Sequence, residues 1–259
     1  MFHFIFAYFS HLIKSFHLHG IHSPFVFQLE KKCLRDASPY ADYLKLSRFR
    51  ESLHNNKSSL HIEDHGAGSR VFKSNDRKVT DILQHNCSTE KDTQLLYRWC
   101  SYFEVNTVLE LGTSLGIATH AMATARPHAQ ITTVEGSPEV YEFAKKALEK
   151  EDLKQVNFVN ATFQDFFKEQ KTPAPIYDLI YIDGHHNGDA TCFYFESILH
   201  QVHNDTVVIF DDIYWSADMT RAWNQICHHP QVTASVDCFD FGLIFFRKEQ
   251  MQEQFYVKL

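Results

Sequence analysis

A glycine-containing turn is the first feature of the sequence that could do chemistry. The segment ELGTSLG (110–116) follows an apolar, strand-like run, and its glycines are Gly112 and Gly116. A strand that turns through glycines into the start of a helix brings backbone N–H groups close to a ligand beyond the carboxyl end of the sheet. These glycines do not form the G-x-G-x-x-G fingerprint of dinucleotide sites, which disfavours a nicotinamide cofactor. A tight turn without any ligand is the simpler alternative.

The acidic residue before the first glycine makes this turn resemble motif I of the class I methyltransferases, which use S-adenosylmethionine (SAM). An acidic turn that lacks a phosphate-binding pattern suits SAM, because the methionine part of SAM is a zwitterion with an ammonium group. The resemblance implies that four residues of the turn bind this cofactor: Glu110, Gly112, Ser114 and Gly116.

Two further positions extend the resemblance to the rest of the cofactor. Glu135 ends the next predicted strand, where a carboxylate accepts hydrogen bonds from both ribose hydroxyls. A solvated glutamate at a strand end is the simpler alternative, but the agreement with the first motif favours the ribose role. In ATFQDF (161–166), the resemblance places Gln164 or Asp165 at the adenine amino group without choosing between them.

Acidic residues also follow the fourth and fifth predicted strands, in YDLIYIDGHH (177–186) and VVIFDDIYWS (207–216). These segments resemble O-methyltransferases with a divalent-metal site, both the catechol and caffeoyl-CoA type and the sugar and macrolide branch. The resemblance implies Mg²⁺ ligands at Asp183, Asp211 and Asp212, and carboxylate oxygens are ligands that this ion prefers. The Asp-Asp pair departs from the Asp-Asn pair of the catechol type.

A histidine near these carboxylates has the chemistry of a general base. A hydroxyl is a poor nucleophile at neutral pH, so a metal that lowers its pKa and a base that removes its proton both assist methyl transfer. His186 lies three positions after Asp183, where the sugar branch carries its proposed base and the catechol type carries a lysine. The resemblance therefore implies catalytic roles for His186 and Asp183. The unusual Asn187-Gly188 continuation leaves the substrate geometry open.

Each of these residues also has a simpler interpretation. Asp183 could bind the SAM amine without a metal, and the pair Asp211 and Asp212 could cap the following helix. His185 and His186 are two of 17 histidines and could face solvent.

Two other segments are candidates for the surroundings of the site. Residues 61–78 contain a glycine loop followed by four basic residues, Arg70, Lys73, Arg77 and Lys78. This segment is either a lid whose cations meet an acidic group or a solvated basic loop. The segment GIHSPFVF (20–27) could line a substrate pocket, although core packing of Phe25 and Phe27 is the simpler expectation.

The elements that must position these residues begin at Val105, where strand and helix patterns start to alternate. Such alternation predicts βαβ units in a doubly wound, mostly parallel α/β sheet, and the resemblance makes it a Rossmann-like methyltransferase fold. Seven strands are expected, at 105–111, 131–135, 156–160, 177–183, 206–212, 232–239 and 241–248. The last two strands are joined by a short turn near Asp240, which permits only antiparallel pairing.

The region before this domain has a different texture. Residues 1–90 are predicted to form a helical N-terminal extension, and residues 91–259 the SAM-binding methyltransferase domain. Five apolar residues near the start recur at helical spacing, which predicts an amphipathic helix that docks on the body of the protein or on a second subunit; they are Phe2, Phe6, Phe9, Ile13 and Phe16. A homodimer is compatible with this helix. A membrane surface is a less favoured partner because Lys14 is its only Lys or Arg, and no segment is long enough to span a bilayer.

Composition limits the partners and the compartment. The formal net charge of −7 argues against a protein that grips a nucleic-acid backbone, and a small-molecule substrate is expected instead. No two of the six cysteines form a C-x-x-C motif. In a chain of this length they are expected to be ordinary thiols of a reducing compartment rather than a disulfide framework, so we expect a cytoplasmic protein.

The leading hypothesis is thus a SAM-dependent enzyme that methylates an oxygen of a small hydroxylated molecule, with Mg²⁺ as a candidate cofactor. A metal-independent transferase acting on nitrogen or another acceptor is the nearest alternative. The sequence IDGHH (182–186) disfavours the amino-methylating nucleic-acid enzymes, which carry D/N-P-P-Y/F after the fourth strand. A SAM-binding module without activity is the non-enzymatic alternative.

Overall fold

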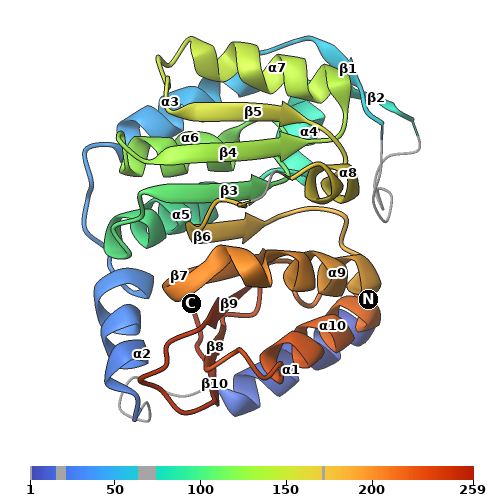
Figure 1. Ribbon diagram of the computed structural model, residues 1–259. Coiled ribbons are helices and arrows are strands. Elements are labelled where there is room, and N and C mark those ends of the chain that lie inside the picture. Colours follow the sequence, from blue (N-terminus) through green and yellow to red (C-terminus); the bar gives the residue numbers. More distant parts are fainter. Residues whose placement is uncertain (1, 16–21, 64–73, 171–172) are drawn as a thin grey trace. The chain divides into compact units, whose positions relative to one another are not determined.

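The computed structural model describes residues 2–15, 22–63, 74–170 and 173–259, and the chain divides into two compact units (Figure 1). The middle of the chain, Ala37–Gln170, forms one unit. The two ends of the chain, Met1–Asp36 and Lys171–Leu259, together form the other. These two units are defined by contacts within the structure. The predicted boundary after residue 90 was based on a change in sequence pattern, and it stays a prediction.

The middle unit is built on three parallel strands in the order β3-β4-β5. These strands are β3 (Thr107–Leu111), β4 (Gln130–Glu135) and β5 (Val156–Asn160). Two helices connect them, α6 (Ile117–Ala125) and α7 (Pro138–Glu149). The connections form successive βαβ units, so the carboxyl ends of all three strands lie at one edge.

Helices and a hairpin complete the middle unit. They are α3 (Tyr43–His54), the antiparallel pair β1 (Ser59–His61) and β2 (Asp76–Lys78), α4 (Val79–His85), α5 (Glu90–Tyr102) and α8 (Phe163–Lys168). Phe49 of α3 and Ile82 of α4 share a buried apolar cluster with Leu115 and Ile117 at the glycine turn. The turn predicted to bind the ligand therefore rests on a packed core.

The unit formed by the chain ends contains five strands in the order β10-β8-β9-β7-β6. They are β6 (Tyr177–Ile182), β7 (Val202–Asp211), β8 (Ala234–Asp237), β9 (Phe241–Phe245) and β10 (Glu253–Tyr256). β9 runs antiparallel to both β7 and β8, as the short turn near Asp240 predicts. All seven predicted strands are present, β10 is an eighth, and the mostly parallel α/β fold class is confirmed.

The helices of this unit include α9 (Gly188–Ile198) and α10 (Ala217–Cys227), which follow β6 and β7. The N-terminal segment adds α1 (Phe2–Lys14), α2 (Pro24–Leu29) and the π-helical turn η2 (Glu30–Leu34), and a 3-10 turn η3 (Leu199–Gln201) follows α9. Helix α1 lies beside α10 (Figure 1), and His3 Nε2 is 3.0 Å from Thr220 Oγ1. None of the described helices is long and apolar enough to cross a membrane.

The predicted helix at the start of the chain is confirmed, but the face on which it packs is not the predicted one. Phe6, Phe9 and Ile13 are 73%, 58% and 85% exposed, whereas Ala7 and His11 on the opposite face are buried. The reason is that His11 is drawn inward to the buried carboxylate of Asp237. The helix therefore docks on its own unit, one of the two predicted alternatives, but through Ala7 and His11 rather than through the apolar stripe, and a second subunit stays a prediction. The side chain of Phe2 and all of Phe16 lie outside the described part.

Candidate active site

The turn after β3 has the backbone that its glycines predict. Gly112 and Gly116 have φ of 111° and 81°, and Ser114 between them has φ of 47°. A Cβ on Gly116 would lie 2.7 Å from Leu148 Cδ1, so this position needs glycine both for its backbone and for space. Gly116 is also the N-cap of α6. The turn therefore passes close to a packed helix and presents backbone groups at the edge of the sheet.

The Glu135 carboxylate at the end of β4 is held against this turn. Its Oε2 accepts a hydrogen bond of 3.0 Å from the Ser114 N–H, and its Oε1 accepts one of 2.9 Å from the Ser137 N–H. Two of the predicted cofactor residues are thus brought together. Because both oxygens are held by backbone amides, the carboxylate is oriented before any ligand arrives.

Glu110 occupies a different environment from the one its motif suggests. Its side chain is fully buried, and Oε2 accepts hydrogen bonds of 2.5 Å from the hydroxyls of Thr119 and Thr133. The Thr113 and Thr133 hydroxyls are also 2.5 Å apart. The Thr133 hydroxyl donates its proton to Glu110, so the Thr113 hydroxyl must be the donor in its contact with Thr133. Thr113 of the turn is thereby connected to Thr133 of β4 and, through it, to Glu110 of β3. A direct contact of Glu110 with SAM stays a prediction.

The two candidates for the adenine group differ in their local roles. Thr162 is the N-cap of α8, and its hydroxyl donates a hydrogen bond of 2.7 Å to Asp165. Lys168 also donates to Asp165, at 3.2 Å. The Asp165 carboxylate is therefore engaged in capping its own helix, while the Gln164 side chain is exposed.

A second group of predicted residues gathers at the ends of the paired strands β6 and β7 in the other unit. The Tyr181 hydroxyl lies 3.2 Å from Asp183 Oδ2 and 3.0 Å from Asp211 Oδ2. Burial raises the pKa of Asp183 to about 6, partly offset by His186, and burial and then Asp183 raise the pKa of Asp211 well above its usual value. A phenol has one proton, so the second contact is made when one carboxyl is protonated.

The loops after these strands carry unusual backbone. His185, His186 and Asp212 have φ of 70°, 34° and 53°. Non-glycine residues in this region cost conformational energy and concentrate at functional sites. His186 Nε2 is 3.9 Å from Asp212 Oδ2, and the His186 ring lies 5.4 Å from that of Trp215. The structure therefore brings His186 to the carboxylates, as predicted.

Sequence reasoning missed three aromatic residues here. Tyr181 bridges the carboxylates, Trp215 lies beside His186, and the Tyr194 hydroxyl is 2.6 Å from His185 Nδ1. One feature could have indicated Tyr181: it lies two positions before Asp183 and so points to the same face of the strand region. Trp215 and Tyr194 are brought in by tertiary packing.

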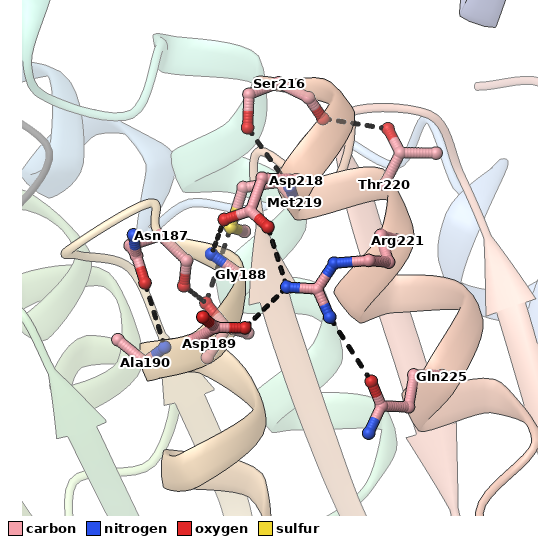
Figure 2. A network of polar contacts seen from close by, with 11 residues as sticks. Asn187, Gly188, Asp189, Ala190, Ser216, Asp218, Met219, Thr220, Arg221 and Gln225 are labelled. Atoms are coloured by element: carbon pink, nitrogen blue, oxygen red, sulfur yellow. Dashed lines mark hydrogen bonds and ion pairs between the residues drawn. The ribbon is translucent and has the colours of Figure 1, made fainter.

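The histidine loop is fixed where α9 begins, as Figure 2 shows. Asp218 Oδ2 accepts a hydrogen bond of 2.6 Å from the Gly188 N–H, and Asn187 caps α9 through the Ala190 N–H. Arg221 bridges Asp218 and Asp189 at 2.7 and 2.6 Å. A Cβ on Gly188 would lie 2.5 Å from the Asp218 carbonyl oxygen. Asn187 thus caps α9, and glycine at position 188 leaves the space in which α10 approaches the start of α9 closely.

The carboxylates after β6 and β7 are the residues that the resemblance implies as metal ligands. Among the residues that the structure describes, no group of three or more His, Cys, Asp or Glu side chains is arranged to hold a metal ion. The oxygen donors of Asp183 and Asp211 suit Mg²⁺ chemically. However, the Tyr181 hydroxyl lies between them and would have to move.

The structure describes only part of the two segments expected to surround the site, residues 61–78 and residues 20–27. Arg70 and Lys73 of the predicted lid lie outside the described residues. Arg77 is buried, and its Nε donates a hydrogen bond of 3.2 Å to the Ser74 carbonyl, so it is not a solvated cation, and the lid stays a prediction. Phe25 packs edge-on against Phe245 with ring centroids 4.9 Å apart, in agreement with the core-packing expectation.

Comparison with known proteins bears on the resemblance to methyltransferases. Residues 109–213 match the family model described as a methyltransferase domain, which confirms the resemblance that the motifs indicated. No curated protein sequence matches the chain.

Solved structures are similar over most of the chain. A SAH-bound methyltransferase from Podospora anserina, PaMTH1, has 15% identity and a TM-score of 0.61, with 88% of this chain and 97% of that chain covered. TomG from Streptomyces achromogenes, an O-methyltransferase of tomaymycin synthesis solved with SAM, has 15% identity and a TM-score of 0.58, with 85% and 99% covered. A putative O-methyltransferase from Klebsiella pneumoniae has 17% identity and a TM-score of 0.56, with 89% and 100% covered. At these identities the likeness shows the fold.

Proposed function

We propose that this chain, whose residues 109–213 carry a methyltransferase domain, transfers the methyl group of SAM to a hydroxyl oxygen of a small molecule. The observation that carries the proposal is the Glu135 carboxylate, held by the Ser114 and Ser137 amides beside the motif I turn. An oriented carboxylate at this strand end suits the two hydroxyls of a ribose.

The middle unit supplies the groups for the methyl donor. Glu135 accepts hydrogen bonds from the ribose hydroxyls, and the Gly112 to Gly116 turn lets the methionine part approach the backbone. Glu110 acts through its threonine contacts, which keep the turn in place. We assign the adenine contact to Gln164 rather than Asp165, because Asp165 is engaged in capping α8.

The other unit supplies the groups for the acceptor. His186 removes the proton of the acceptor hydroxyl, and Asp212 lies close enough to stabilise the resulting imidazolium. The acceptor oxygen forms a bond to the methyl carbon of SAM while the carbon–sulfur bond breaks, and the electron pair stays on sulfur in the product S-adenosylhomocysteine. Alignment of the three atoms is the main contribution that the protein makes to such a displacement.

A divalent cation is the second part of the proposal. Asp183, Asp211 and Asp212 would hold Mg²⁺, with the Tyr181 hydroxyl displaced from between Asp183 and Asp211. The raised pKa of Asp211, caused by burial and by the neighbouring Asp183, supports this assignment, since a cation offsets both effects. When bound, Mg²⁺ would lower the pKa of the acceptor hydroxyl.

The cysteines bear on the compartment. All six lie in the described part of the chain and none of them is in a disulfide there, and Cys33, Cys100, Cys227 and Cys238 are buried. Thiols without disulfides are typical of a reducing environment, which supports the cytoplasmic location that we propose.

The test begins with calorimetric titration of SAM into wild-type protein, Glu135→Ala and the matched control Glu142→Ala, whose side chain is exposed on α7. We expect SAM to bind wild type and the control and to bind Glu135→Ala at least tenfold more weakly. Transfer of labelled methyl from SAM is then measured with phenols, catechols, sugars and amines, with Mg²⁺ or with EDTA, on wild type and His186→Ala.

The outcomes separate the candidate functions. Absence of SAM binding to wild type would overturn the proposal. Binding with transfer only to amines would replace the oxygen acceptor by nitrogen, and transfer in EDTA at the full rate would remove the metal. Binding without transfer to any acceptor would favour the SAM-binding module.

A further inference from the structure

Helix α1 is attached to its unit by a face of mixed character, on which Ala7 is buried and the Phe4 and Tyr8 rings pack edge-on against Phe239. His3 contacts Thr220, His11 contacts Asp237, and Lys14 donates to the Tyr256 hydroxyl. The His11 and Asp237 side chains are 2% and 0% exposed, so this contact is in the interior. An amphipathic helix on a folded domain ordinarily buries its apolar face instead. The helix thus buries a histidine and aromatic face, held by the His11–Asp237 pair and by ring contacts with Phe239, rather than its most apolar stripe.

The apolar face of α1 points outward as a consequence. Ile5, Phe6, Phe9 and Ile13 are all exposed, and Ile13 is the most exposed of them. At about 3.6 residues per turn, these four positions form one continuous stripe along the helix. Phe4 and Tyr8, which are partly exposed, flank it. The four residues of the stripe offer about 600 Å² of accessible surface, which is at the upper end of the largest apolar patch on a typical monomer.

The charges around the stripe favour one kind of partner. Residues 1–29 contain no Asp or Glu, and α1 has Lys14 as its only Lys or Arg. Helices that lie on membranes are rich in Lys and Arg on their polar face, and the net charge of −7 opposes approach to anionic lipid. An uncharged stripe meets no repulsion from an identical copy. The observations therefore favour a protein partner over a lipid surface.

We propose that α1 forms the interface of a homodimer, in which the stripe Ile5, Phe6, Phe9 and Ile13 of one copy packs on the same stripe of a second copy. Such an isologous contact closes after two copies and leaves no further stripe exposed. Two copies would bury about 1,200 Å², which reaches the lower end of stable protein interfaces. The interface is separate from the residues proposed for catalysis.

The test is the oligomeric state of the full chain, measured by sedimentation velocity from about 1 to 100 µM. We expect a dimer for wild type and a monomer for the double variant Phe6→Glu/Ile13→Glu. The matched control is Ser10→Glu, which puts the same charge on an exposed position of α1 to one side of the stripe. It should remain a dimer. Because all three substituted side chains are exposed, circular dichroism and SAM titration should match wild type in every variant.

A cross-linking variant tests the arrangement independently of affinity. Phe9 lies near the middle of the stripe, so Phe9→Cys should give a disulfide-linked dimer under mild oxidation, and Ser10→Cys should give at least tenfold less. A monomeric wild type at 100 µM would overturn the proposal, as would a double variant that stays dimeric. Binding of the monomer to neutral or anionic vesicles, lost in the double variant, would replace the second copy by a lipid surface.

Discussion

At the scale of single residues, the candidate site depends on carboxylates whose surroundings differ. Backbone amides of Ser114 and Ser137 hold the Glu135 carboxylate in place at the edge of a sheet. Asp183 and Asp211 share a tyrosine hydroxyl instead, and burial raises the pKa of both. These acidic side chains are thereby suited to different tasks. Glu135 can accept hydrogen bonds, whereas Asp183 and Asp211 can bind positive charge or exchange a proton.

The role of Glu135 can be tested by removing its charge alone. Glu135→Gln keeps the size of the side chain but replaces one oxygen by an amide group that donates, so it repels the Ser114 or Ser137 N–H and loses a charged acceptor for ribose. Hydrogen bonds to charged groups contribute about 1.5–3 kcal/mol, so the Kd for SAM should rise about 10- to 100-fold. Calorimetry measures this, with Glu142→Gln as the control. An unchanged Kd would remove Glu135 from the cofactor site.

His120 predicts how stability depends on pH. It is buried and stacks on Phe49 with ring centroids 4.4 Å apart, and burial, with a smaller effect of Lys45, lowers its pKa to about 4. Glu151, 3.7 Å away, would act in the opposite direction, but its side chain is 40% exposed and burial dominates. The unfolded chain takes up the proton near pH 6.5 and the folded chain only near pH 4. Stability is therefore complete above about pH 6.5 and is lost as the pH falls toward 4.

The size of this effect is measurable by urea unfolding at two pH values. Between pH 7.5 and pH 5, His120 should account for about 2 kcal/mol of the loss in unfolding free energy. His120→Gln should lose less stability over this interval than wild type, by that amount, although it is less stable at pH 7.5. His128→Gln, at an exposed position, should behave like wild type. Equal pH dependence in all three proteins would contradict the assignment.

Some residue roles could be predicted from the sequence and others could not. The position of Glu135 follows from strand order and local pattern, which a sequence carries. The burial of Glu110 among threonines and the placement of Tyr181 between carboxylates depend on contacts between segments far apart in the chain. The resemblance implied Mg²⁺ ligands at Asp183 and Asp211, but it gave no sign that the Tyr181 hydroxyl contacts both carboxyl groups.

At the scale of elements, the histidine loop depends on how closely α9 approaches α10. Gly188 begins α9, and its N–H is bound by Asp218 in the first turn of α10 (Figure 2). This contact fixes the end of the loop that carries His185 and His186. A small displacement of a catalytic group has a large effect on rate, because the reaction requires alignment.

Gly188→Ala tests this contact. The added methyl would meet the Asp218 backbone and carboxylate, so the start of α9 must move, with a loss of about 1–3 kcal/mol in stability. We expect kcat to fall about 100-fold while the Kd for SAM is unchanged, since the cofactor groups lie in the other unit. Arg221→Gln is the control. It breaks exposed ion pairs, which contribute little to stability in water, and leaves the Asp218 contact with Gly188 intact. Comparable losses of kcat in both variants would show that the ion pairs, not the close approach, position the loop.

Elements were predicted well where hydrophobic runs alternate with helix-start residues. Ser137, Thr162 and Ser216 each precede a helix, and Thr162 and Ser216 cap it with their hydroxyls. Ser137 does not, because its hydroxyl instead donates to the His61 carbonyl and accepts from the Glu63 N–H. β10 was not predicted, because its four residues have no apolar alternation.

At the scale of the whole molecule, the chain makes one compact unit from its two ends. The sequence could not show this, since His11 and Asp237 are 226 positions apart. Asp237 gathers donors from several elements: the Tyr214 hydroxyl at 2.6 Å, the Trp223 indole N–H at 3.2 Å and the Phe239 N–H at 3.0 Å. His11 adds a basic group from α1. A buried carboxylate with so many donors makes the attachment of α1 specific.

His11→Ala should therefore loosen the N-terminal helix and weaken the whole unit. Removing one member of a buried pair leaves a carboxylate with less compensation, which costs about 3 kcal/mol. His3→Ala removes a partly buried hydrogen bond to Thr220 and should cost about 1 kcal/mol. Urea unfolding gives these values, and amide hydrogen exchange locates them: protection of residues 2–15 should be lost in His11→Ala and largely kept in His3→Ala. If both variants lose protection equally, α1 is held by its contacts as a whole, and the Asp237 pair has no special part in fixing the direction in which its apolar stripe points.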